Sequence, residues 1–309
     1  MELGGEAVVK ALFIYPVKSC RGIAVPHAAI TPTGFKWDRQ WMIVNQNGKL
    51  LTQRAVKKLA LVEVTLPDEA LDCRWGSLSP DAALHIKAPG MEPLHIPLVP
   101  QYPLEKVENI TCWEWSGTAL SEGVEAAEWL TKYIGKPASL VRFDNENAVR
   151  PTDPDFAVGH KVSFSDGYPF LLISQASLDG LNEKLSADLP IDRFRPNIYV
   201  DGCEAFAEDK WETFRIGDLQ FHGVKLCSRC TVPTIDQQTA EAGKEPTQTL
   251  RSFRKGSFLD IESMKNEVFF GQNITCEDAG LPVNGIAPAV RVGDVVRVLK
   301  TAPVSEIMS

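Results

Sequence analysis

The chain has 309 residues, which is long enough to bury a sizeable core and to form one large domain or two ordinary ones. Apolar residues make up 44% and charged residues 23%, as in ordinary globular proteins, and no run of about 18 apolar residues is present, which excludes a membrane-spanning helix. The net charge of −8 disfavours nucleic acid as a partner, and seven cysteines without a secretion signal favour free thiols over a disulfide framework.

The first 60 residues differ in charge from the rest of the chain. They hold nine Lys and Arg against three Asp and Glu, a net charge of +6 that leaves −14 for the remainder. Such a segment is either a solvated basic face or a surface that binds anions, and both readings stay open. Its start, MELGGEAVVKALFIY, carries Glu2 and Glu6 where a signal or transit peptide would be basic, so we expect a cytoplasmic protein.

Short β-type runs dominate the chain. They are rich in Val, Ile, Leu and aromatic residues and are bounded by Gly, Pro, Asn or Asp, a pattern typical of strands. The runs are VVKALFIY (8–15), WMIV (41–44), LALVEVTL (59–66), ALHIKA (83–88), NITCWEW (109–115), SLVRF (139–143), PNIYV (196–200), LQFHGVKL (219–226) and DVVRVL (294–299). We therefore predict a mainly β protein.

Two helices are predicted, and both are short. The first spans residues 121–134, with Ser121 as its N-cap and Gly135 just past its end, and the second spans residues 174–185. Helices this sparse cannot alternate with strands in a parallel doubly wound fold, so barrels or sandwiches fit better. We predict two β-barrel-like domains with a few short helices, one over residues 6–135 and one over residues 136–301.

The sequence contains one clear cysteine motif and lacks the common catalytic ones. Glycine-rich loops for dinucleotides and triphosphates are absent, and the five histidines stand apart, so a His-rich metal site is not expected. In KLCSRCTVPTIDQQTA (225–240), Cys227 and Cys230 have the spacing C-x-x-C. Such a pair can belong to a zinc site, to a redox dithiol, or to one metal-binding thiolate beside a structural neighbour.

The surroundings of this motif weaken two of the three readings. A structural zinc site usually has a second C-x-x-C, but the other cysteines stand singly. The following TVPT (231–234) is β-branched and broken by proline, so we expect the pair in a loop after strand 219–226, without the helix N-terminus that activates a dithiol. A loop thiolate suits a thiophilic metal, and Arg229 can neutralise an anion carried with that metal.

Three further stretches have the character of an anion site. YPVKSCRG (15–22) follows a strand with a proline turn and offers Lys, Ser, Arg and free backbone N–H groups. Residues 37–39 (WDR) and 193–197 (RFRPN) place guanidinium groups beside strands, where planar bonds to phosphate can form. Each stretch alone is weak, because an Arg near a strand end is usually a surface ion pair. Their occurrence together favours a metal with an anionic cofactor.

At these residues the sequence resembles the amidoxime-reducing component family of molybdenum enzymes, within the MOSC group. The plant branch is nearest, and the matching stretches run in the family's order across most of the chain. They are YPVKSCRG (15–22), WDRQWMIV (37–44), FSDGYPFLLISQASL (164–178), FRPNIYVDGCE (194–204), EDKW (208–211), KLCSRCTVPTIDQQT (225–239), TLRSFR (249–254) and FFGQN (269–273). The resemblance implies an N-terminal MOSC-type barrel followed by the MOSC domain proper.

The resemblance also implies a molybdenum–molybdopterin cofactor between the two domains. Cys230 would bind molybdenum and take part in catalysis, with Cys227 as its structural neighbour. The cofactor contacts would be Lys18, Ser19, Arg39, Asp166, Gly167, Tyr168, Arg195, Asn197, Ser228 and Arg229, together with Cys230. Gly167 and Tyr168 stand where animal members have small hydroxyl residues, so we expect only backbone contacts from these two.

The activity implied is reduction of small N-hydroxylated compounds, such as amidoximes, N-hydroxyguanidines and hydroxylated nucleobases, to amines or amidines. Electrons would come from NADH through cytochrome b5 reductase and cytochrome b5, since the sequence has no haem or flavin motif of its own. Basic residues outside the cofactor site would receive the acidic cytochrome: Lys36, Lys49, Arg54, Lys57 and Lys58. Animal members carry a membrane anchor that this sequence does not show, so mitochondrial association rests on the family alone.

A second reading comes from another class of protein. The cysteine loop also resembles the C-terminal MOSC part of molybdenum cofactor sulfurases, whose ID-QQT segment is echoed at residues 235–239. This reading predicts a cofactor carrier or sulfuration domain without reductase activity. Sulfurases place a large pyridoxal-phosphate domain ahead of that part, for which 309 residues leave no room, so the reductase is favoured. A zinc-binding module is the third reading.

Overall fold

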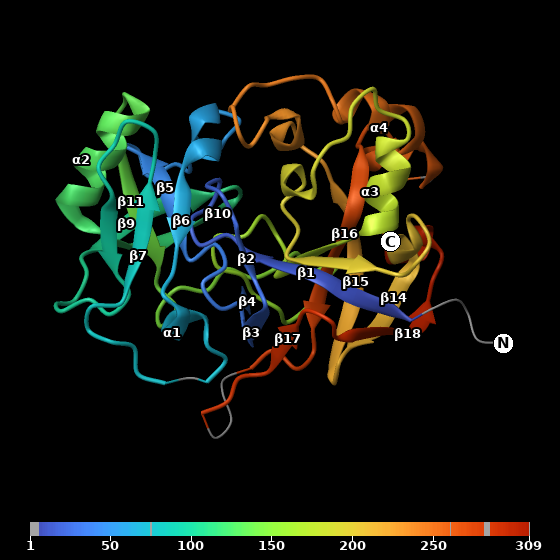
Figure 1. Cartoon of the computed structure of the whole chain (residues 1–309), viewed down its shortest axis with the longest axis horizontal. Coiled ribbons are helices and arrows are strands. Elements are labelled where there is room, and N and C mark those ends of the chain that lie inside the picture. Colours follow the sequence, from blue (N-terminus) through green and yellow to red (C-terminus); the bar gives the residue numbers. More distant parts are fainter. Residues whose placement is uncertain (1–5, 75, 260, 281–284, 309) are drawn as a thin grey trace.

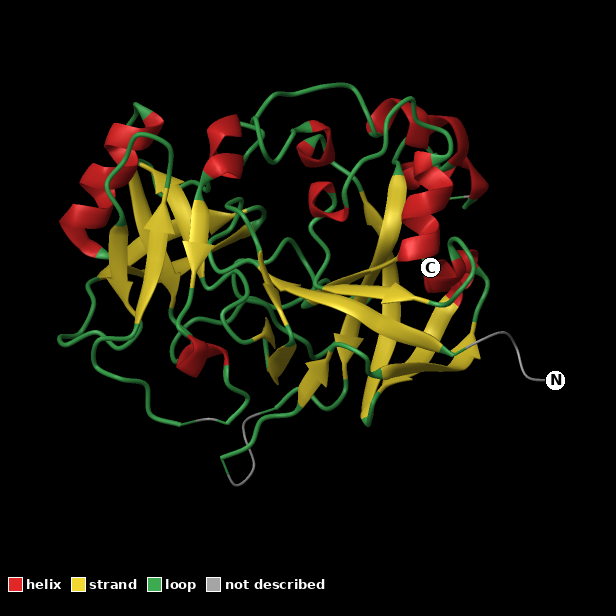
Figure 2. Cartoon of the chain, in the orientation of Figure 1, coloured by secondary structure: helices red, strands yellow, loops and turns green. Residues whose placement is uncertain are grey.

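The computed structural model describes residues 6–74, 76–259, 261–280 and 285–308. The chain forms two lobes side by side, one built from the early strands β5 to β11 and one that contains β14 to β16 and β18 (Figure 1). Strands and long connecting loops dominate both lobes, and the helices are short (Figure 2). The prediction of a mainly β fold with two barrel-like parts and few short helices is confirmed.

The larger lobe is a closed barrel. Its strands are ordered β13-β12-β16-β15-β14-β18-β1, and β1 pairs again with β13 to close the ring. These strands are β1 (Ala7–Ile14), β12 (Phe170–Ser174), β13 (Ile198–Asp201), β14 (Trp211–Ile216), β15 (Leu219–Ser228), β16 (Phe269–Cys276) and β18 (Val295–Thr301). The short β2 (Ile23–Val25) pairs antiparallel with the last three residues of β1. Closure leaves the barrel with few unpaired edges.

The other lobe is a half-barrel of smaller sheets. A four-stranded antiparallel sheet has the order β5-β11-β10-β9, and a three-stranded sheet has the order β6-β7-β8. Their strands are β5 (Trp41–Asn45), β6 (Glu63–Thr65), β7 (Ala83–Lys87), β8 (Leu94–Pro97), β9 (Lys106–Cys112), β10 (Trp115–Ser121) and β11 (Ala138–Phe143). A third small sheet joins β3 (His27–Thr31), β4 (Gly34–Phe35) and β17 (Ala289–Arg291).

The strand pairing crosses the predicted division at residue 135 in both directions. The first strand, β1, pairs with β13 and β18 and so completes the barrel formed by late strands. Conversely, β11 begins at Ala138 and pairs with β5 in the half-barrel. One hydrophobic core runs through both lobes and includes Leu12, Trp41, Leu84 and Phe214. The division into residues 6–135 and 136–301 therefore stays a prediction about sequence units.

The helices lie outside the sheets. They are α1 (Asp68–Leu71), α2 (Gly123–Ile134), α3 (Gln175–Asn182), α4 (Thr247–Phe253) and α5 (Val304–Ile307), with 3-10 turns η1 (Lys57–Leu61), η2 (Ile191–Arg193), η3 (Ala207–Lys210), η4 (Val232–Thr234), η5 (Gly256–Phe258) and η6 (Glu262–Met264). Gly135 ends α2 in the left-handed conformation, as predicted. The N-cap of α2 is Glu122, one residue later than predicted. Ser174 caps α3 by accepting a bond from the Ser177 N–H.

Two predicted strands are wrong in part. In the run 59–66, the first residues belong to the 3-10 turn η1 and the strand is confined to Glu63–Thr65. The run 109–115 is a hairpin, in which β9 ends at Cys112 and β10 begins at Trp115. Its β-branched and aromatic residues hide the turn, where Trp113 adopts a positive φ of 57°. This turn carries Trp113 to the site described below.

The carboxylate of Glu122 is buried in the half-barrel, and its removal should be costly. It pairs with Arg142 at 2.7 Å and accepts a hydrogen bond from the Trp41 indole. We expect Glu122→Ala to lower the free energy of unfolding by about 3–5 kcal/mol, because it leaves a buried guanidinium without its carboxylate. Urea unfolding measures this change. Glu128→Ala, at an exposed position of the same helix, should stay within about 0.5 kcal/mol of wild type, and equal losses would contradict the argument.

Candidate active site

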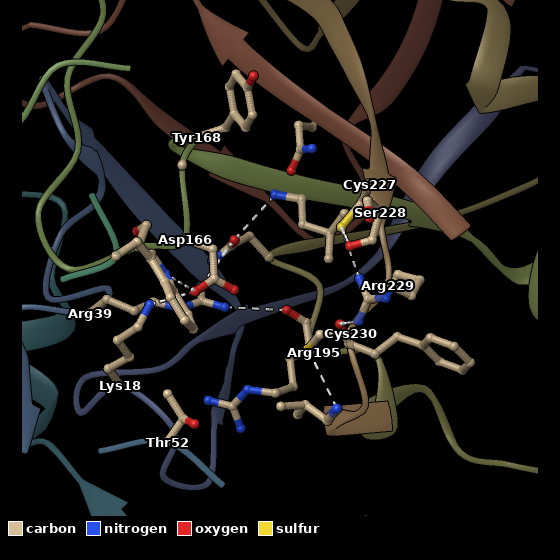
Figure 3. Close-up of a pocket in the computed structure, with 18 of the residues that line it drawn as sticks. Lys18, Arg39, Thr52, Asp166, Tyr168, Arg195, Cys227, Ser228, Arg229 and Cys230 are labelled. Carbon is tan, nitrogen blue, oxygen red and sulfur yellow. Dashed lines mark hydrogen bonds and ion pairs between the residues drawn. The ribbon is translucent and has the colours of Figure 1, made fainter. Parts of the chain in front are cut away.

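A cavity of about 560 Å³ lies between the β9–β10 turn, the segment after β1, residues 165–168 and the cysteine loop. Every residue predicted to contact a cofactor lines it: Lys18, Ser19, Arg39, Asp166, Gly167, Tyr168, Arg195, Asn197, Ser228, Arg229 and Cys230. Figure 3 shows Lys18, Arg39 and Asp166 on one side and the residues of the cysteine loop on the other. Contact of these residues with a cofactor stays a prediction.

The cysteine motif begins in a strand and ends in a loop. Strand β15 pairs with β16 as far as Ser228 opposite Phe269, so Cys227 is the penultimate residue of a strand. The prediction of a loop is therefore right for Cys230 and wrong for Cys227. The strand holds the first cysteine rigidly and leaves the second at the start of the turn that leads into η4.

The two cysteines of this motif have different environments. The Cys227 sulfur accepts a hydrogen bond from Arg229 Nη1 at 3.1 Å, and burial raises the pKa of its thiol although Arg229 opposes the change. Cys230 is exposed, and its sulfur accepts a bond from the Val232 N–H at 3.4 Å. The accessible thiol of the cavity is therefore that of Cys230.

Two guanidinium groups that line the cavity pack against one buried aromatic ring. The guanidinium carbons of Arg39 and Arg195 are 4.2 and 4.3 Å from the centroid of the Tyr15 ring. Arg39 is paired with Asp38 at 2.6 Å. Arg195 has no hydrogen-bond or ion-pair partner for its guanidinium among the described residues, and burial lowers its pKa. Arginine remains charged nonetheless, so Arg195 is a cation without a directly bonded counterion among the described residues.

Asp166 is held beside Lys18 at the cavity wall. Its Oδ1 accepts hydrogen bonds from Lys18 Nζ at 2.6 Å and from the Trp113 indole at 3.1 Å. The surrounding cavity walls raise the pKa of this carboxyl, whose side chain is itself exposed, but the charge and hydrogen bond of Lys18 outweigh that effect and hold the pKa well below its usual range. Asp166 is therefore ionised at neutral pH and does not serve as a proton donor there.

The side chains of the remaining predicted residues differ in how fully they are already hydrogen-bonded within the protein. Asn197 accepts bonds from Arg39 Nη1 and from the Leu171 N–H and donates to the Phe13 carbonyl, so its amide mainly positions protein groups. The Ser228 hydroxyl donates a hydrogen bond to the Glu267 carboxylate. The Tyr168 side chain points away from both groups of labelled residues in Figure 3, and backbone contact from this residue to a cofactor stays a prediction.

Backbone strain gathers at this cavity. Ser19, Arg39 and Arg195 have φ values of 70°, 47° and 57°, in the left-handed region that residues other than glycine seldom adopt. Each such residue costs on the order of 1–3 kcal/mol and persists where the surrounding structure over-determines it. All three residues line the cavity, so the shape of this wall is kept at a cost in folding stability.

Several lining residues were not expected from the sequence. They include Thr52, Arg54, Trp113, Glu114, Ser165 and Lys225. Arg54, which we expected on a docking surface, instead stacks on the Trp113 ring with 4.5 Å between its guanidinium carbon and the ring centroid. The sequence hid Trp113 because the turn that carries it reads as part of one strand. Counting the unexpected residues, six Lys and Arg side chains face two carboxylates around the cavity, a balance that suits an anionic ligand.

A histidine pair outside the cavity was also missed. His85 and His95 lie directly opposite each other on β7 and β8, with 2.6 Å between their Nδ1 atoms. Their separation in the sequence gave no sign of this contact. Over the described ranges, no group of three or more His, Cys, Asp or Glu side chains is placed to hold a metal ion.

The barrel architecture and the thiol-bearing cavity agree with two family matches. The MOSC N-terminal beta barrel domain matches residues 6–137, and the MOSC domain matches residues 159–297. The fold and the site thus define a MOSC-domain protein of the molybdenum oxidoreductase class. In the described part of the chain, no helix has the length and apolar character to span a membrane.

Relatives identify the family within this class. Mitochondrial amidoxime-reducing component 1 of Homo sapiens is 33% identical over 302 residues, which covers 94% of this chain and 82% of the relative. Mitochondrial amidoxime reducing component 2 of Rattus norvegicus is 33% identical over 305 residues, covering 95% and 83%. The chain belongs to the amidoxime-reducing component family. Among solved structures, the YUAD protein from Bacillus subtilis aligns over 96% of this chain and 97% of its own, but with a TM-score of 0.35 and 9% identity it supports no conclusion.

Proposed function

We propose that the cavity binds a molybdenum–molybdopterin cofactor and that Cys230 is its protein ligand to the metal. The observation that carries this proposal is that an accessible thiol and an uncompensated guanidinium, Arg195, face one cavity whose lining is net positive. A thiolate suits a thiophilic metal, and a cation without a counterion suits a phosphate group. The residues present therefore fit the cofactor that the family uses.

The cations that line the cavity differ in whether they are already paired with a carboxylate of the protein. Arg195, Arg54 and Arg229 have no carboxylate partner among the described residues. Arg229 is already bonded to the Cys227 sulfur and the Phe194 carbonyl, so Arg195 and Arg54 are the cations with the most freedom to bind a phosphate. Lys18 and Arg39 are already bonded to Asp166 and Asp38, and they mainly shape the wall. When bound, the cofactor supplies the two-electron chemistry that cleaves an N–O bond. The chain supplies binding, orientation and charge.

The proposed reaction is reduction of N-hydroxylated compounds, such as amidoximes, N-hydroxyguanidines and hydroxylated nucleobases, to amines or amidines. The names of the relatives support this substrate class. We assign electron delivery to NADH, cytochrome b5 reductase and cytochrome b5. Mixing these components with benzamidoxime should yield benzamidine at a rate proportional to the molybdenum content. Cofactor-loaded protein without turnover would instead support the carrier or sulfuration alternative.

Electron transfer from cytochrome b5 should depend strongly on salt. With Arg54 in the cavity, the other members of the predicted docking set are Lys36, Lys49, Lys57 and Lys58. Of these, Lys36 Nζ lies 5.6 Å from the Trp37 ring centroid and Lys58 Nζ lies 4.8 Å from that of Tyr133. Turnover with cytochrome b5 should fall steeply from roughly 20 to 300 mM salt, over which the screening length shrinks from about 20 Å to under 10 Å. Turnover with a small neutral reductant should barely change. Identical salt profiles for both reductants would place the docking site elsewhere.

For cellular location, we propose an association with mitochondria, as the names of the relatives state for those proteins. The sequence itself predicts a cytoplasmic protein. Fractionation of cells that express the tagged full-length protein distinguishes the two, since an associated protein sediments with the mitochondria and a cytoplasmic one stays in the supernatant.

A further inference from the structure

The wall that carries Asp166 is an irregular stretch of backbone. Residues 163–166 lie in the connection between β11 and β12 and belong to no helix or strand. Ser163 and Ser165 are almost fully buried, at 1% and 4% exposure. Buried carbonyl groups need hydrogen-bond donors, and among the described residues no backbone N–H donates to these four. A neighbouring strand supplies only the weak Cys112 thiol, whose sulfur is 4.0 Å from the Phe164 carbonyl oxygen.

Two buried cations provide the donors for this stretch. Arg150 Nη1 donates to the carbonyls of Ser163, at 3.1 Å, and Ser165, and Arg150 Nη2 donates to that of Asp166 at 2.9 Å. Lys18 Nζ donates to the carbonyl of Phe164 at 2.7 Å. Four successive carbonyls are thus held, three of them by the single planar fork of Arg150.

The position of Arg150 suits it to bind these carbonyl groups. It is 5% exposed, and its own carbonyl accepts a bond from the Val162 N–H at 2.9 Å, which anchors it beside the start of the stretch. No carboxylate within the described ranges forms an ion pair with it. A buried arginine without an acidic partner is costly, and its three carbonyl bonds are the compensation that the structure shows.

We propose that Arg150 is a positioning residue for the cofactor site, which fixes the Asp166 wall so that Lys18 and Asp166 keep their places at the cavity. This inference rests on the proposed binding of the molybdenum cofactor. Arg150 does not line the cavity and touches no ligand space, so it acts through the backbone of residues 163–166. Lysine cannot replace it fully, because a single ammonium does not reproduce the planar fork.

The test compares Arg150→Met and Arg150→Lys with matched changes at Arg142. Arg142 is also buried, at 8% exposure, and donates to the carbonyls of Pro97 and Leu98, but it lies in the half-barrel away from the cavity. For each full-length protein loaded with cofactor, the dissociation constant of the molybdenum cofactor and the urea midpoint are measured. Replacing either arginine should lower the urea midpoint of unfolding.

Only the Arg150 changes should weaken cofactor binding. We expect about a 10- to 100-fold higher dissociation constant for Arg150→Met, a smaller rise for Arg150→Lys, and wild-type values for both Arg142 variants, as for residues that orient a ligand shell. If Arg150→Met does not fold, the two lysine variants decide the comparison. Wild-type cofactor affinity in the Arg150 variants would overturn the inference while leaving the proposed function intact. An equal loss of cofactor affinity in the Arg150 and Arg142 variants would do the same. A wild-type chain that binds no cofactor would overturn both.

Discussion

Cys230→Ser should abolish reductase activity, whereas Cys227→Ser should leave substantial activity. A neutral hydroxyl is a poor replacement for a thiolate on a thiophilic metal, and Cys230 offers the accessible sulfur of the cavity. Cys227 is held in β15 with a raised thiol pKa and bonded to Arg229, so it remains a protonated neighbour at neutral pH.

Steady-state turnover of benzamidoxime by the two purified variants measures this difference. Molybdenum content is determined on the same samples, so that loss of metal is separated from loss of chemistry. Equal loss of activity in both variants would sink the assignment of a single thiolate ligand. Full activity in Cys230→Ser would remove this residue from the site altogether.

The second large effect is expected at Arg195. Its guanidinium stacks on Tyr15 and lacks a counterion among the described residues, so a phosphate group would be its natural partner. Arg195→Ala should remove a charge-assisted contact worth about 1.5–3 kcal/mol, which is roughly one to two decades of cofactor affinity. Molybdenum and pterin should therefore fall together in the isolated variant.

An arginine on the outside of the barrel provides the control for this change. Arg215 is exposed on β14, and Arg215→Ala should keep wild-type occupancy of molybdenum and pterin. If Arg195→Ala also keeps full occupancy and only its turnover drops, Arg195 belongs to substrate handling. Occupancy measured against protein concentration distinguishes these outcomes directly.

The sequence predicted the parts of the fold that depend on local patterns. Runs rich in Val, Ile, Leu and aromatic residues marked most strands, and Gly135 and Ser174 marked a helix end and a helix start that the structure confirms. It could not show that β1 completes a barrel made of late strands, because strand pairing between distant segments leaves no local trace. The division of the chain near residue 135 was inferred from proline-containing stretches on either side of a helix and stays a prediction about sequence units.

The candidate site was even harder to predict from local sequence patterns than the fold. The predicted residues come from separate stretches, and only the family resemblance placed them at one site before the structure was known. Trp113 was hidden because its turn lies between two strands with the same residue types. Arg54 and Arg150 were missed because their roles arise from what they reach in space, the Trp113 ring and the carbonyls of residues 163–166.

Analysis of metal and pterin in the purified full-length protein tests the central claim most directly. If the cavity holds a molybdenum cofactor through Cys230, the wild-type protein should contain molybdenum and pterin in equal amounts, each stoichiometric with the chain. Cys230→Ser should retain pterin more readily than metal, because the basic lining of the cavity is unchanged. Zinc in place of molybdenum, or protein that takes up neither molybdenum nor pterin when both are supplied, would contradict the account.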